Sequence, residues 1–161
     1  MIHRSRLYHN TGMRTRHSWY RALKIQIFSS KKPNMRENHL FEYAVIRVVP
    51  HVEREEFLNV GIILYCANQK FLKTKVNLKE EKLSMLCDSL DIAELKNHIA
   101  SFEKICAGGN MAGTIGKLSI AERFRWLTAT RSTMLQTSKV HPGLCHDASE
   151  MLERLFAQLV S

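Results

Sequence analysis

The residues best suited to chemistry form one acid-free stretch in the second half of the chain. No Asp or Glu lies between Arg123 and His141. Guanidinium groups bind phosphate or carboxylate through two parallel hydrogen bonds, and neighbouring hydroxyl groups complete such a site. Trp126 can add a face for stacking on a base or on an arginine. The stretch therefore predicts an anion site built from Arg123, Arg125, Arg131, Ser132, Thr133, Gln136, Ser138 and His141.

Two arginines from the first half of the domain can face the same pocket. Arg47 belongs to an expected strand, and Arg54 lies in the charged link after it. Glu56 and Asn59, at the end of that link, complete the set of candidate ligand- or partner-binding residues. The predicted site requires that guanidinium groups from distant parts of the chain meet in one pocket.

A simpler interpretation competes with the anion site. Isolated arginine clusters are often solvated or ion-paired, and Trp126 can simply belong to the core. In that case glutamates neutralise Arg123 and Arg125, and the available partners are Glu53, Glu55, Glu56 and Glu122.

The sequence holds no recognisable catalytic motif, so no catalytic residue is predicted. His51 near Glu53, or His141 near Ser138, can form an acid–base pair, but neither has a third orienting group at a recognisable spacing. The glycine-rich residues 108–116 fail as a phosphate loop, because position 111 is Met111 and Leu118 follows the lysine. We expect no metal and no cofactor.

The four cysteines, Cys66, Cys87, Cys106 and Cys145, form no C-x-x-C element. Cysteines of this kind are expected to be reduced and mostly buried, as in a cytoplasmic protein. No apolar run approaches the roughly 20 residues that a membrane-spanning helix needs.

Nearly all of the excess positive charge lies at the start of the chain. The net charge is +9, and residues 1–34 carry eight Lys or Arg and no acid. Residues 35–161 are therefore close to neutral, which removes the charge argument for a nucleic-acid-binding domain. Residues 1–34 can be an organelle presequence, a basic nucleic-acid arm, or a disordered segment foreign to the working protein. We favour the last interpretation, with one domain over residues 35–161.

The periodicity of the domain predicts strands first and helices afterwards. Residues 43–49, 60–66 and 71–77 have strand patterns, and a short fourth strand is possible within residues 131–138. A turn of helix is expected in residues 51–59. Amphipathic helices are predicted over residues 79–90, 92–106, 119–127 and from residue 147 to the end of the chain. The expected fold class is α+β, a small mostly antiparallel sheet of three to four strands with about four helices packed on one face.

Several segments resemble a bacterial family catalogued as domain of unknown function 3037. They are residues 41–66, the run Cys106-Ala-Gly-Gly, and the run Arg123-Phe-Arg-Trp-Leu-Thr-Ala-Thr-Arg-Ser-Thr with Gln136, Ser138 and His141-Pro-Gly after it. The likeness extends from Phe41 to Val160 and leaves residues 1–34 outside. One departure is Glu55, where the family pattern leads us to expect Gly, and it suggests a helical link.

The resemblance implies a small cytoplasmic bacterial protein of unassigned activity. It also implies a protein partner encoded nearby, because genes of this family often neighbour kinase-like genes of the Hip toxin type. Our first hypothesis is a non-enzymatic accessory or binding protein with an arginine-lined pocket for an anionic small molecule or a partner. The alternatives are an enzyme acting on a phosphorylated or nucleic-acid substrate, with His141 or His51 as proton carrier, and nucleic-acid binding through the basic arm.

Overall fold

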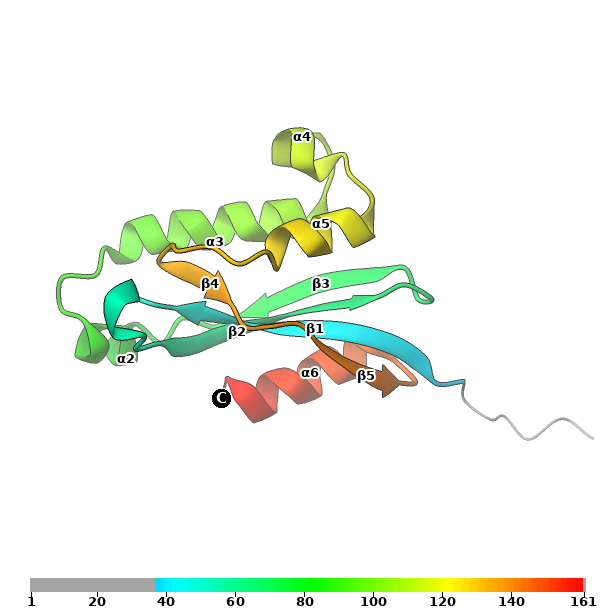
Figure 1. Cartoon of the computed structure of the whole chain (residues 1–161), viewed down its shortest axis with the longest axis horizontal. Coiled ribbons are helices and arrows are strands. Elements are labelled where there is room, and N and C mark those ends of the chain that lie inside the picture. Colours follow the sequence, from blue (N-terminus) through cyan, green and yellow to red (C-terminus); the bar gives the residue numbers. More distant parts are fainter. Residues whose placement is uncertain (1–36, 161) are drawn as a thin grey trace, which may run out of the picture. The chain divides into compact units, whose positions relative to one another are not determined.

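A five-stranded antiparallel sheet forms the centre of the molecule. The computed structural model describes residues 37–160, so the expectations for residues 1–34 lie outside the described part of the chain. The sheet has the order β3-β2-β1-β4, and β5 also pairs with β1 (Figure 1). The strands are β1 (His39–Val48), β2 (Leu58–Cys66), β3 (Phe71–Val76), β4 (Leu135–Thr137) and β5 (His141–Cys145).

Strands β4 and β5 share one edge of β1. β4 lies opposite Ile46–Val48, and β5 lies opposite His39–Tyr43. Between them, the backbone N–H of Ser138 donates to the carbonyl of Val45 at 2.8 Å. The Ser138 hydroxyl accepts a hydrogen bond from the Val45 N–H at 2.9 Å, so the buried Ser138 completes the edge of β1.

Four of the helices form where the sequence predicts them, and side chains cap the three longest. A 3-10 turn and a four-residue helix also form within the glycine-rich residues 108–116, where no helix is predicted. Asp91 accepts a hydrogen bond from the Glu94 N–H, Asp147 caps the last helix, and Ser119 forms a reciprocal capping box with Glu122. The expected turn of helix in the link after β1 is a 3-10 turn. The elements are η1 (Val52–Arg54), α2 (Glu80–Leu86), α3 (Ile92–Ala107), η2 (Asn110–Ala112), α4 (Gly113–Gly116), α5 (Ile120–Leu127) and α6 (Ala148–Leu159).

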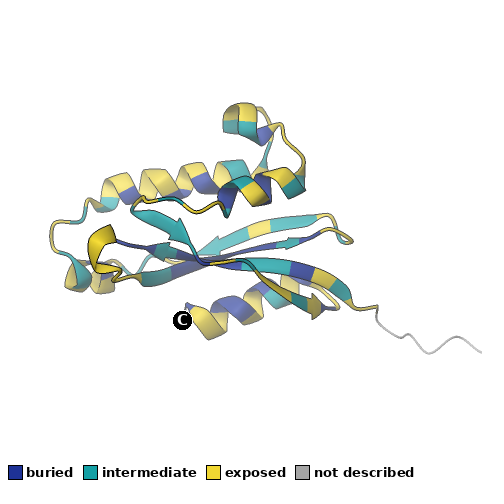
Figure 2. Ribbon diagram, in the orientation of Figure 1, coloured by how far each residue is buried: buried dark blue, intermediate teal, exposed yellow. Residues whose placement is uncertain are grey.

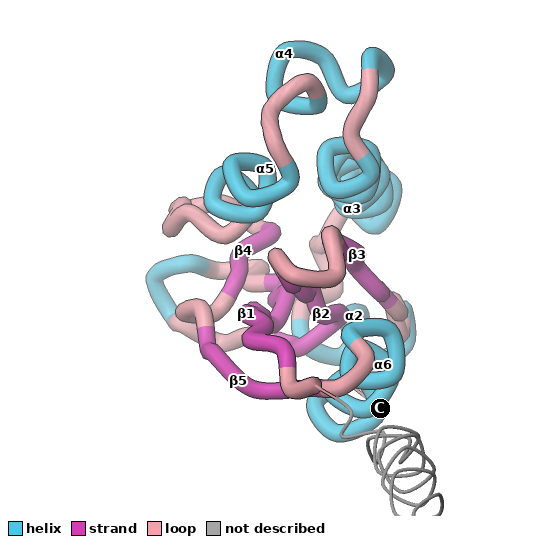
Figure 3. The backbone as a smooth tube through the Cα atoms, turned by 90° about the vertical axis from the view of Figure 1, so that its right-hand side faces the viewer, coloured by secondary structure: helices cyan, strands magenta, loops and turns pink. Residues whose placement is uncertain are grey.

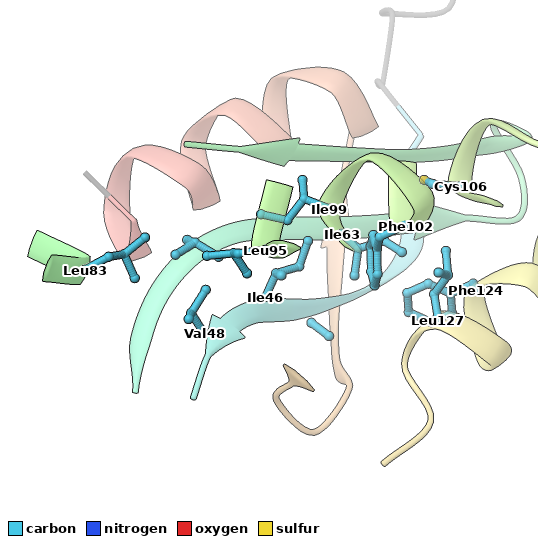
Figure 4. Packing of buried hydrophobic residues seen from close by; sticks show 12 residues of the cluster. Ile46, Val48, Ile63, Leu83, Leu95, Ile99, Phe102, Cys106, Phe124 and Leu127 are labelled. Atoms are coloured by element: carbon cyan, nitrogen blue, oxygen red, sulfur yellow. The ribbon is translucent and has the colours of Figure 1, made fainter. Parts of the chain in front are cut away.

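The larger core lies between one face of the sheet and the helices α3 and α5. Ile46 and Ile63 from the sheet pack with Phe102 of α3 and with Phe124 and Leu127 of α5 (Figure 4). The ring of Phe124 stacks on Tyr65 at 5.3 Å between centroids. This packing fixes α3 beside α5 above the sheet, as the view along the strands shows (Figure 3).

The expectation that the helices cover a single face is wrong, because α6 packs on the opposite face. Phe41 and Val45 of β1 and Ile62 of β2 form a second core there with Leu152 and Phe156 of α6. Buried residues occur along both β1 and β2 (Figure 2). The sheet is therefore the middle of three layers.

No helix within residues 37–160 is long and apolar enough to cross a bilayer.

Candidate functional site

The predicted arginines do not meet in one pocket. Arg123 is buried, and its guanidinium binds the end of α3 instead of lining a ligand site. Its Nη1 donates to the carbonyl of Cys106 at 3.2 Å and to that of Ile105 at 3.4 Å. These carbonyls lie in the last turn of α3, where carbonyl groups lack backbone N–H partners within the helix. Arg123 thus holds the end of α3 against α5.

Arg125 is neutralised by a carboxylate, as the simpler interpretation allowed, but its partner is Glu42. Nη1 donates to Oε1 of Glu42 at 3.0 Å and Nη2 to Oε2 at 2.7 Å, which is a bidentate pair. These hydrogen bonds to Glu42 raise the pKa of Arg125 above its ordinary value. A guanidinium that already holds a carboxylate is not free for a second anion.

Arg47 lies on the opposite face of the sheet from Arg125. It stacks over the ring of Phe57 at 4.1 Å, and its register partners are Asn59 and Gln136. Asn59 donates through Nδ2 to the carbonyl of Leu159 in α6. In the described residues, Nε of Arg47 and Oδ1 of Asn59 are buried without a hydrogen-bond partner. Arg47 and Asn59 therefore form a separate group beside the end of α6, whereas Gln136 lines the same pocket as Arg131.

The remaining candidates are scattered over the surface or occupied by local contacts. Arg54, Glu56 and Ser132 are exposed. His141 is exposed on β5 and stacks on Tyr43 at 5.4 Å between centroids. Its expected partner Ser138 is committed to the backbone: besides accepting from Val45, its hydroxyl donates to the carbonyl of Lys139. The Ser138–His141 acid–base pair therefore does not form.

Arg131 is the one predicted arginine that lines a pocket. Its guanidinium stacks on the ring of Trp126 at 3.8 Å, and Nη2 donates to the Trp126 carbonyl at 2.6 Å. Within the described residues it makes no ion pair. The residue is half-buried and lines the pocket.

The pocket lies between α3, the end of α5, the loop after it, and β4. Its volume is about 200 Å³. Thr133, whose hydroxyl donates to the carbonyl of Leu135, lies beside Arg131 on the wall. The apolar part of the lining comes from Phe102, Ile105, Leu127, Met134 and Leu135.

Sequence reasoning missed the contribution of α3 to this pocket. His98 and Ser101 line it from that helix. Both are exposed, and in the sequence they occupy the polar face of an amphipathic helix, where solvated side chains are the ordinary expectation. The only available signal was the general expectation that the helices pack together on one face of the sheet, which does not say which helix lies beside the arginine-bearing segment. Among residues 37–160 no group of three or more His, Cys, Asp and Glu is arranged to hold a metal ion.

Comparisons with known proteins give one positive result. No curated protein and no solved structure matches the chain. The profile of the family described as protein of unknown function (DUF3037) matches residues 43–160. These residues include every wall of the pocket and all buried residues of both cores except Phe41. The chain belongs to the DUF3037 family of proteins of unknown function.

Proposed function

We propose that the domain is a non-enzymatic binding module, and that the pocket between α3, α5 and β4 takes a small organic carboxylate. Arg131 binds the carboxylate, and the apolar wall holds the body of the ligand. The observation that carries this proposal is the state of Arg131. It is half-buried beside the pocket, held by Trp126, and without an ion pair in the described part of the chain.

The guanidinium of Arg131 is prepared for a planar anion. Of its five N–H donors, the described residues occupy one, through Nη2 and the Trp126 carbonyl. Stacking on Trp126 fixes the plane of the group before a ligand arrives. Preorganisation of this kind lowers the entropic cost of binding, and the fork of an arginine matches the two oxygens of a carboxylate.

The lining favours a monoanion with an apolar body. A polyphosphate would need several cations around it, and among residues 37–160 Arg131 is the only Lys or Arg that lines the pocket. Phe102, Leu127 and Met134 offer surface to an aliphatic or aromatic group instead. Ligand pockets for drug-sized molecules measure roughly 300–1,000 Å³, so a volume of about 200 Å³ suits a smaller compound.

The other hypotheses receive less support from this geometry. Stacking of a nucleic-acid base on Trp126 competes with Arg131, which already covers one face of the ring. The accessory role implied by the family resemblance uses the same chemistry, because an acidic side chain of a kinase-like partner also presents a carboxylate on an apolar stem. The small-molecule ligand is the one that the size of the pocket favours.

Equilibrium titrations of the full chain test the proposal. Trp19→Phe leaves Trp126 as the only tryptophan, and its fluorescence is recorded against benzoate, hexanoate and inorganic phosphate. We expect saturable binding of a carboxylate, a loss of at least about tenfold in affinity in Arg131→Gln, and unchanged affinity in Arg125→Gln. Arg125→Gln is the control, because it removes the same charge from an arginine that is paired with Glu42 outside the pocket. Absence of carboxylate binding up to millimolar concentration, or equal losses in both variants, would overturn it.

A further inference from the structure

A second group of reactive side chains lies apart from the pocket, where α2 ends beside the link between β1 and β2 (Figure 1). Sγ of Cys87 lies 3.6 Å from Nε2 of His51. On the other side of the imidazole, Nδ1 lies 3.7 Å from Oε1 of Glu53. A nucleophile, a base and a carboxylate in this order form the arrangement that activates a thiol.

Cys87 is also the cysteine that reagents can reach. The chain has four cysteines, all within the described residues, and Cys66, Cys106 and Cys145 are buried. Cys87 is partly exposed at the end of α2. The thiolate is the reactive form of cysteine, so access and a nearby base must occur together. Only Cys87 has both in this structure.

The surroundings of Cys87 favour thiol–disulfide exchange over acyl transfer. The hydroxyl of Ser89 lies 3.3 Å from Sγ and can donate to a thiolate. The backbone N–H of Cys87 is already bonded to the carbonyl of Leu83. It is therefore unavailable as an oxyanion donor, which acyl transfer to cysteine would require. Thiol–disulfide exchange needs no oxyanion site, because sulfur is both attacker and leaving group.

We propose that Cys87 is a thiol–disulfide exchange site, with His51 as the proton acceptor and Glu53 as the residue that positions it. The thiol proton passes from Sγ to Nε2 of His51. The thiolate then attacks one sulfur of a small disulfide, so that a new S–S bond forms as the old one breaks. The departing sulfur leaves as a thiolate and takes the proton from the imidazolium. Cys87 is oxidised to a mixed disulfide, the departing sulfur is reduced, and a second thiol reverses the step.

Local charge sets the class of substrate. The carboxylate of Glu53, the neighbouring Asp88 and the carbonyl end of α2 all place negative charge or partial charge around Cys87. Cationic disulfides are therefore preferred over anionic ones. This preference separates the site from the pocket at Arg131, which takes anions.

The experiment exposes the folded full chain to cystamine, a cationic disulfide, and to dithiodiglycolate, an anionic one. Intact-mass and peptide mapping should find one adduct per chain, located on Cys87, and faster reaction with cystamine. Peptide mapping needs no variant, so the location of the adduct is decided on the native protein.

Variants then test the role of the imidazole. His51→Gln should slow the reaction at neutral pH at least about tenfold, since a positioned base contributes at least that much. His146→Gln is the matched control, because it removes an exposed histidine between β5 and α6 whose Nδ1 lies 3.3 Å from the carbonyl of Glu37. First labelling on Cys66, Cys106 or Cys145, or an unchanged rate in His51→Gln, would overturn the proposal.

Discussion

Arg123 lies directly against the backbone of Gly108. A Cβ built on Gly108 would stand 1.6 Å from Nη1 of Arg123, closer than any real contact allows. The guanidinium therefore occupies the space that a side chain at position 108 would need, and from there it reaches the carbonyls that end α3. This contact explains why an arginine that looks like a ligand residue in the sequence serves the fold.

Gly108→Ala should destabilise the protein more than Gly109→Ala does. Both glycines have positive φ, 79° and 92°, so each substitution carries a backbone cost of about 1 kcal/mol. Only at Gly108 does the new methyl group displace Arg123, because nothing lies within 4 Å of a Cβ at Gly109. We expect an additional loss of about 2 kcal/mol, the value of hydrogen bonds to a charged donor. Urea unfolding measures the free energy of unfolding of the two variants. Equal losses in Gly108→Ala and Gly109→Ala would contradict the structural role of Arg123.

Cys106 should make stability fall at alkaline pH. Burial is the main reason that the pKa of its thiol rises from 9.0 to about 12, against a smaller opposing effect of Arg123. Between these values the unfolded chain loses the thiol proton while the folded chain keeps it, so unfolding becomes easier as pH rises. The slope from this group is at most about 1.4 kcal/mol per pH unit. In Cys106→Ala, the free energy of unfolding measured with urea should decline less steeply above about pH 9. An unchanged slope would show that Cys106 is not the cause of the alkaline loss of stability.

Glu55→Gly should stabilise the link between β1 and β2. Glu55 ends η1 in the left-handed region, with φ of 56°, where a side chain meets the following carbonyl. Glycine removes this strain, and after its greater freedom in the unfolded chain is counted, a gain of about 0.5 kcal/mol is expected. Glu56→Gly is the control, since Glu56 is exposed and its φ is not positive. The midpoint temperature of thermal unfolding should rise for Glu55→Gly and fall slightly for Glu56→Gly.

The sequence predicted most elements because their signals are local. Period-two and continuous apolar runs marked β1, β2 and β3, and capping residues such as Asp91 and Ser119 marked helix starts. Strand β5 was missed because His-Pro-Gly at its start has the composition of a turn. Pro142 is tolerated there because β5 pairs only with β1 and lies at the sheet edge.

The placement of α6 was missed although its cause is visible in the sequence. The near-continuous apolar run of β2 requires a cover on both faces, and a single helical layer can cover one. The expectation that all helices lie on one face was based instead on the order of the elements along the chain, with strands first and helices afterwards. Leu152 and Phe156 of α6 pack on the face that remained.

The arginine site shows where sequence reasoning ends. Arg123 and Arg125 are two positions apart on a helix, so at 3.6 residues per turn their side chains diverge by roughly 200° and cannot share a pocket. The predicted helix over residues 119–127 is enough to establish this divergence. By contrast, the pairing of Arg125 with Glu42, far away in the sequence, depends on how α5 packs on the sheet. The stacking of Arg131 on Trp126 depends on the path of an irregular loop, for which the sequence gives no periodic signal.

The carboxylate site at Arg131 is tested most directly by the ¹H–¹⁵N spectrum of the full-length Trp19→Phe protein during titration with a small carboxylate such as benzoate. The proposed site predicts shifts of the Trp126 indole resonance and of the amides of Thr133 and Leu135, with α6 resonances unmoved. Arg131→Gln should remove these shifts. A spectrum in which the pocket resonances stay in place, or in which the shifts cluster around Arg47 and the end of α6, would contradict the account.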